Sequence, residues 1–117
     1  MISGRFSRSF RLRKGSQFQA ISNKSHTFYG RALFIAYKAN GLPHARLGIT
    51  VTKKFGEAHV RNRFKRLVRE GFRQTPGRME QGVDLNVRPK NIKGKNPVLP
   101  SLQDVVADFK EFFEKLA

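Results

Sequence analysis

The residues with the clearest chemical role are the cationic side chains between Lys53 and Arg73. This stretch holds eight lysines and arginines but only two acids, Glu57 and Glu70. So few acids cannot neutralise the surface through ion pairs, which disfavours the simpler interpretation of a solvated helix face. Guanidinium and ammonium groups in such excess bind phosphates, and arginine does so through a bidentate fork. The composition therefore predicts a surface for a nucleic-acid backbone.

Aromatic side chains form a second candidate surface, made of Phe18, Phe34 and Tyr37. Aromatics that lie on a sheet face beside cations can stack on single-stranded bases. The alternative is that these rings pack in the core, which must hold for some of them. The sequence leaves both roles open.

A helix over residues 57–74 must position the cations. Its apolar residues recur at offsets of four, seven, eight and twelve, and so form one stripe: Val60, Phe64, Leu67, Val68 and Phe72. At 100° per residue, the opposite side of the helix carries Lys65, Arg66, Arg69 and Arg73. Residues 46–52 alternate as a half-buried strand and lead into Lys53 and Lys54, which extend the basic surface.

The remaining segments predict one α+β domain over residues 1–117, with a basic tail at 1–10. A short helix is expected over 16–23, a strand over 31–38, a hairpin loop over 40–44 and a third strand over 83–88. A loop over 89–100 precedes a strongly amphipathic helix that begins after the capping residue Ser101. The order α-β-β-α-β-α describes a small sandwich of a mixed sheet with helices.

The net charge of +16 supports a polyanionic partner, because such self-repulsion opposes compaction unless phosphates lie nearby. No acid occurs before Glu57, whereas four of the eight acids lie between Asp104 and Glu114. The C-terminal helix is thus a near-neutral exception, with its acids expected on its surface. The chain has no cysteine, no apolar run of about 18 residues and no secretory signal, which together predict a cytoplasmic protein.

No autonomous active site is evident in the sequence. The three histidines, His26, His44 and His59, are isolated from one another, and the first half of the chain has no carboxylate to pair with them. The sequence also contains no Gly-rich phosphate loop and no cluster of metal ligands. A ribonuclease site assembled in space from histidine and lysine remains an alternative, and it would cleave RNA without an RNA partner.

Two segments together resemble the signature of the bacterial ribonuclease P protein subunit. The first is Arg46-Leu-Gly-Ile-Thr-Val-Thr-Lys-Lys, and the second is Arg61-Asn-Arg-Phe-Lys-Arg-Leu-Val-Arg-Glu. Residues 11–19 also resemble the first helix of that family, and residues 87–89 resemble its third strand. The resemblance therefore spans residues 11–90.

The resemblance implies a subunit that joins a catalytic RNA to remove the 5′ leader from precursor tRNA, within an endonuclease whose magnesium ions the RNA holds. It implies no cofactor on the protein, no obligate protein partner and a left-handed β-α-β crossover. The residues implied to bind the catalytic RNA, together with the two lysines before the helix, are Lys53, Lys54, Arg61, Asn62, Arg63, Lys65, Arg66 and Arg69. The residues expected in the leader cleft are Arg11, Arg13, Phe18, Phe34 and Tyr37.

The chain departs from the family pattern in two places. Ser22 stands where a second cleft aromatic is common, and Asp84 with Asn86 makes one face of the third strand polar. Two further alternatives stay open. A basic ribosomal protein would have a similar composition, and would co-purify with ribosomes. A DNA-binding protein that uses the helix over 57–74 would need another helix just before it, where the sequence predicts a strand.

Overall fold

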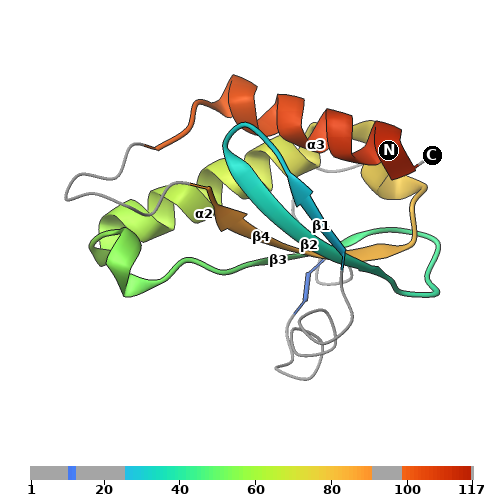
Figure 1. Ribbon diagram of the computed structural model, residues 1–117, viewed down its shortest axis with the longest axis horizontal. Coiled ribbons are helices and arrows are strands. Elements are labelled where there is room, and N and C mark those ends of the chain that lie inside the picture. Colours follow the sequence, from blue (N-terminus) through green and yellow to red (C-terminus); the bar gives the residue numbers. More distant parts are fainter. Residues whose placement is uncertain (1–10, 13–25, 91–98, 117) are drawn as a thin grey trace.

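The structure is a computed structural model that describes residues 11–12, 26–90 and 99–116, with the backbone alone at Met79. Along the chain (Figure 1) lie β1 (His26–Tyr29), β2 (Leu33–Ala39), β3 (Arg46–Ile49), the 3-10 turn η2 (Lys53–Phe55), α2 (Ala58–Arg73), the 3-10 turn η3 (Pro76–Met79), β4 (Val83–Pro89) and α3 (Leu102–Leu116). The predicted helix at 16–23, the tail at 1–10 and most of the loop at 89–100 fall outside the described residues.

The four strands form one mixed sheet in the order β1-β2-β4-β3. β4 lies in the interior of the sheet, antiparallel to β2 and parallel to β3. α2 connects the two parallel strands, so β3, α2 and β4 form the expected β-α-β unit within an α+β fold. The left-handed sense of that crossover stays a prediction.

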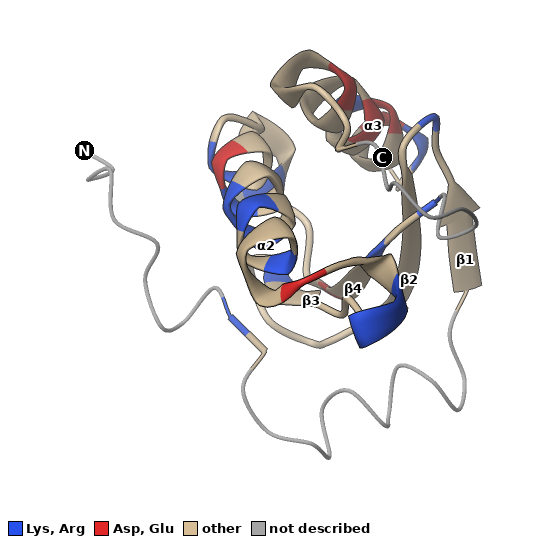
Figure 2. Ribbon diagram, turned by 90° about the vertical axis from the view of Figure 1, so that its left-hand side faces the viewer, with Lys and Arg blue, Asp and Glu red and all other residues tan. Residues whose placement is uncertain are grey.

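α2 and α3 lie on the same side of the sheet (Figure 2), and the core fills the space between sheet and helices. β2 and β4 alternate, and their inward residues include Leu33, Ile35, Leu85 and Val87, all with no exposed surface. The helices contribute the predicted stripes, whose buried members are Phe64, Val68, Phe72, Val105, Phe109, Phe112 and Phe113. Both amphipathic patterns are confirmed.

The other side of the sheet, here called the outer face, is ordered in rows by the strand register. One row places Tyr29 opposite Phe34, and Phe34 opposite Arg88. The next row is made of small or short residues: Thr27, Ala36, Asn86 and Gly48. The third row is charged, with Lys38 opposite Asp84 and Asp84 opposite Arg46.

The predicted hairpin at 40–44 is wrong, because β4 separates β2 from β3 in the sheet. The hairpin partner of β2 is instead β1, a strand that the sequence did not predict. The predicted strand over 46–52 is also shorter, since β3 ends at Ile49 and η2 follows. The helix expected over 57–74 is confirmed as α2.

Candidate nucleic-acid interface

The basic surface of α2 consists of cations that the helix displays around its buried stripe. Asn62, Arg63 and Arg66 are exposed, while Arg61, Lys65 and Arg69 are half-buried. Lys53 and Lys54 extend the same end of the helix from η2 and are exposed. All eight predicted RNA-binding residues therefore lie on one continuous stretch, η2 and α2.

The acids near α2 neutralise little of this charge. Glu70 Oε2 accepts a hydrogen bond from Arg73 Nη2 at 2.7 Å. At the start of the helix, Glu57 Oε2 lies 3.5 Å from His59 Nδ1. In the described part of the chain, no ion pair involves Arg61, Arg63 or Arg66. The helix thus retains a cationic surface that can neutralise phosphates.

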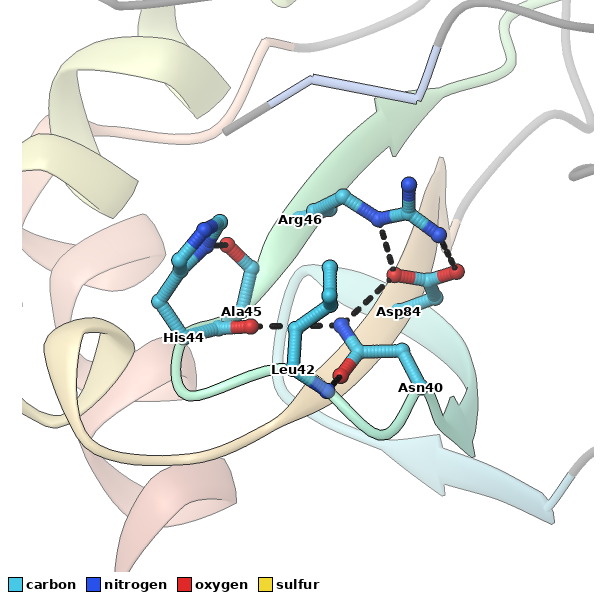
Figure 3. A network of polar contacts seen from close by, with 6 residues as sticks. All are labelled: Asn40, Leu42, His44, Ala45, Arg46 and Asp84. Atoms are coloured by element: carbon cyan, nitrogen blue, oxygen red, sulfur yellow. Dashed lines mark hydrogen bonds and ion pairs between the residues drawn. The ribbon is translucent and has the colours of Figure 1, made fainter. Parts of the chain in front are cut away.

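Arg46, which opens the signature segment, is engaged elsewhere (Figure 3). Its Nε and Nη2 atoms donate to the two carboxylate oxygens of Asp84 at 2.7 and 2.6 Å. The hydrogen bond that Arg46 donates to Asp84 raises the pKa of the Arg46 guanidinium. Asn40 Nδ2 also donates to Asp84, at 2.9 Å, and to the carbonyl of His44, at 3.2 Å. Asp84 therefore joins Arg46 of β3 to Asn40, which in turn holds the loop after β2.

This network explains why β4 can be polar on one face. Asp84 is neutralised by Arg46, and Asn86 Oδ1 accepts a hydrogen bond from the Thr50 hydroxyl at 2.9 Å. Both polar side chains point to the outer face, so neither disturbs the core. The departure from the family pattern is accommodated by partners within the same sheet.

The predicted leader cleft is not assembled as expected. Tyr37 packs edge-on against Phe112 of α3, on the helix side of the sheet, with 5.0 Å between the ring centroids. Phe34 packs edge-on against Tyr29 at 5.1 Å, on the outer face. A single cleft that contains both Phe34 and Tyr37 is wrong, because positions of odd and even number in β2 point to opposite faces.

Of the other predicted cleft residues, Arg11 is exposed at the β3 edge of the sheet, where it forms a parallel bridge with Leu47. Arg13 and Phe18 lie outside the described residues. The departure at Ser22 lies outside them too.

Sequence reasoning missed Tyr29, whose surface is 69% exposed on the outer face. It stands beside Phe34 and in the same row as the exposed Arg88. The signal available was the alternation in β1, where buried Phe28 is flanked by Thr27 and Tyr29. Four residues are too short a stretch for this period to be distinguished from a loop.

Sequence reasoning also placed the acids of the C-terminal helix on its surface, which is wrong for Asp108. This residue is 1% exposed and accepts hydrogen bonds from the backbone N–H groups of Arg31, Ala32 and Leu33 at 2.9, 2.9 and 3.0 Å. A Cβ atom added to Gly30 would lie 2.5 Å from Asp108 Cγ. The carboxylate therefore ties the turn between β1 and β2 to α3, and with it the position of Tyr29.

The histidines lie on three separate elements, namely β1, the loop before β3, and α2. His44 Nδ1 lies 3.0 Å from the carbonyl oxygen of Ala45, and His26 packs against Tyr37. Within the described ranges, no three His, Cys, Asp or Glu residues gather as metal ligands do. A helix-turn-helix DNA-binding domain would have another helix just before α2. Here β3 and the 3-10 turn η2 precede α2 instead.

A basic helix held against a mixed sheet in this way is the architecture of a known family. The family model described as Ribonuclease P matches residues 6–117. This chain belongs to the ribonuclease P protein family. The ribonuclease P protein component of Thermotoga petrophila is 40% identical over 85 residues, which cover 73% of this chain and 73% of that protein. The component of Fusobacterium nucleatum is 31% identical over 103 residues, covering 88% and 93%.

Solved structures of the family share the fold. The ribonuclease P protein of Thermotoga maritima superposes with a TM-score of 0.75 at 29% identity, covering 92% of this chain and 97% of that one. A mutant of the Staphylococcus aureus protein with defective mRNA degradation activity superposes with a TM-score of 0.73 at 26% identity, covering 93% and 89%. The fold class predicted from the sequence is confirmed.

Membership makes the chain a protein component of ribonuclease P, the ribonucleoprotein endonuclease that matures the 5′ end of tRNA. Its partner in that particle is the ribonuclease P RNA. Among the described residues, no helix is both long and apolar enough to cross a bilayer.

Proposed function

We propose that the chain performs this function with two surfaces: the cations of η2 and α2 bind the catalytic RNA, and the outer face binds the 5′ leader of precursor tRNA. The observation that supports the division is the placement of the side chains. The cations project from a helix on one side of the sheet, and the pair formed by exposed Tyr29 and half-buried Phe34 lies on the other side. Two RNA strands can therefore contact the protein at once.

The helix surface would act through charge. Catalytic RNA and precursor tRNA are both polyanions, so cations between them reduce their mutual repulsion. Each phosphate contact should add about 0.7 to 0.9 to the slope of log affinity against log salt. These contacts are to the RNA backbone, so they depend little on the RNA sequence.

The outer face would act through stacking. A base stacked on an aromatic side chain gains about 1–3 kcal/mol in single-strand complexes. Tyr29 and Phe34 offer this contact, and Arg88 in the same row can neutralise the adjacent phosphate. Tyr37, packed against Phe112, would take no part.

Magnesium is expected for the reaction, and the described residues do not fit it as a bound ion. Mg²⁺ prefers several oxygen ligands in octahedral geometry, and the described residues contain no such cluster of acids. We assign magnesium binding to the RNA. The protein supplies no catalytic residue in this proposal.

The deciding experiment is cleavage of a precursor tRNA at low magnesium, with and without a bacterial ribonuclease P RNA. We expect cleavage at the mature 5′ end only when protein and RNA are both present. Replacing Tyr29 and Phe34 by alanine should weaken binding of precursor with a leader, and leave binding of mature tRNA unchanged. Cleavage by the protein alone would refute the proposal.

A further inference from the structure

A pocket of about 130 Å³ lies where the β3 edge of the sheet, α2 and the segment Arg11–Leu12 meet. Its floor is made of β3 residues, including Gly48, which has no side chain to fill it. Its polar walls are Arg11, Lys65 and Arg69. The pocket therefore brings together a residue expected in the leader cleft and two expected to bind the catalytic RNA.

Backbone pairing holds Arg11 at this place. The N–H of Leu12 donates to the carbonyl of Leu47 at 2.9 Å, and Arg11 pairs with Leu47 in a parallel bridge. The Leu12 side chain is only 6% exposed and packs with Ala36 on the outer face. Arg11 thus belongs to the edge of the sheet, next to α2.

Helical spacing brings the other two cations to the same side. Lys65 and Arg69 are four residues apart, so they lie one above the other on the flank of α2 that faces β3. Both are half-buried, whereas Arg63 and Arg66 are exposed to solvent. The two flanks of α2 can therefore be tested separately.

The charges of the pocket are all of one sign. Among the described residues, no acid lines it. Burial, and then the charge of Arg11, lower the pKa of the Arg69 guanidinium. The Arg69 guanidinium still stays protonated at neutral pH, because the ordinary pKa of arginine is so high. A half-buried pocket lined by several cations has a positive potential, which attracts an anion.

We propose that Arg11, Lys65 and Arg69 together bind one phosphate group of an RNA strand. At about 30 Å³ per water molecule, the pocket has room for about four waters, which suits a tetrahedral anion. The guanidinium forks and the ammonium group can surround such an anion. The inference rests on the proposed function only in taking RNA as the source of the phosphate.

The test is a double-mutant cycle with Arg11→Gln and Arg69→Gln, read as affinity for RNA against salt concentration. If both cations hold one phosphate, either substitution should weaken binding on the order of tenfold, and the double variant should be little weaker. The salt slope should fall by about 0.7 to 0.9 in the single and double variants alike. If the two cations instead contact different phosphates, their losses in affinity should multiply in the double variant, and the salt slope should fall about twice as far. That result would overturn the proposal.

The matched control pairs Arg69→Gln with Arg63→Gln on the other flank of α2, where the effects should multiply. Because Arg69 is half-buried, a second cycle with Arg11→Gln and Lys65→Gln replaces the first if the Arg69 variant melts early. Melting followed by circular dichroism identifies that case.

The source of the phosphate is separated by measuring two RNAs. If the two substitutions are non-additive in the affinity for the ribonuclease P RNA by itself, the phosphate belongs to that RNA. Coupling that occurs only when the holoenzyme binds precursor tRNA with a leader assigns it to the leader. Multiplicative losses with both RNAs overturn the shared site, whereas cleavage by the unaltered particle would still support the proposed function.

Discussion

α2 and α3 pack side by side on one face of the sheet and have nearly equal lengths, 16 and 15 residues. Each buries an aromatic stripe, and Phe72 meets Phe109 edge-on at 5.6 Å. Their charges nevertheless differ. α2 carries six lysines and arginines with one acid, whereas α3 carries two lysines with four acids. The two helices therefore share one way of packing on the sheet, while their solvent sides differ in the charge that they would offer to RNA.

The helices also differ in what they bury. Every buried residue of α2 is apolar or glycine, whereas α3 buries Asp108. In the described part of the chain, the basic helix therefore meets the core through apolar packing, whereas the acidic helix also accepts buried hydrogen bonds from the β1–β2 turn. This comparison of α2 with α3 can be tested by substitutions that change either the surface charge or the buried polar group of one helix.

The largest effect is expected for Asp108→Ala. It leaves three backbone N–H groups without their acceptor, which should lower the free energy of unfolding by about 3 kcal/mol or more. Urea unfolding measures the loss. Glu114→Ala, which removes an exposed acid from the same helix, should leave the midpoint unchanged. Equal losses for both variants would show that the buried carboxylate has no special role.

The next effect concerns RNA affinity. Arg63→Ala combined with Arg66→Ala should weaken binding to the ribonuclease P RNA and lower the salt slope by roughly 1.5, because two phosphate contacts are lost. Circular dichroism should be unchanged, since both side chains are exposed. The matched control on α3 is Lys110→Ala combined with Lys115→Ala. A similar fall in slope for this control would show that RNA does not distinguish the two helices.

A smaller effect is expected where the helices touch. A Cβ atom at Gly71 would lie 2.5 Å from Val105 Cγ1, so Gly71→Ala should overpack the contact. The overpacking costs about 1–3 kcal/mol, of which the better helix propensity of alanine offsets up to about 1 kcal/mol. Thermal unfolding of Gly71→Ala, Val105→Ala and the double variant measures the coupling. A double variant as unstable as the sum would contradict direct contact.

The smallest effect concerns the helix starts. The Ser101 hydroxyl accepts the N–H of Asp104 at 3.1 Å, whereas Glu57 makes no side-chain cap on α2. Ser101→Ala should therefore destabilise the protein by about 1 kcal/mol, and Glu57→Ser should stabilise it slightly. Melting temperatures compare the two variants. The melting temperature should fall for Ser101→Ala and rise for Glu57→Ser. A fall for both variants would mean that α2 gains nothing from a capping side chain.

The sequence was sufficient where structure depends on local periodicity. α2 and α3 each bury one continuous stripe, and the Ser101 cap is formed as predicted. The order of the strands was not predictable in this way, because β4 inserts between β2 and β3 through pairings between residues far apart in sequence. The Asn-Gly pair after β2 is typical of hairpins, yet it leads here to a strand that is not a neighbour.

The candidate site was predictable in composition but not in assembly. Every α2 cation of the signature was identified, whereas the engagement of Arg46 with Asp84 depends on the register between β3 and β4. Asp108 left one usable signal, since it lies three residues after Val105, at the border of the apolar stripe. A carboxylate at such a border can face water or the interior, and only the approach of the β1–β2 turn decides which.

The interior position of β4 has a consequence for how the protein is made on the ribosome. β2 pairs on one side of β4 and β3 on the other, so neither β1–β2 nor β3 can join the complete sheet before residues 83–89 have been synthesised. The basic segment emerges earlier, while the surface that will receive its apolar stripe is still incomplete. A nascent chain therefore exposes these cations before the sheet that supports their helix is complete.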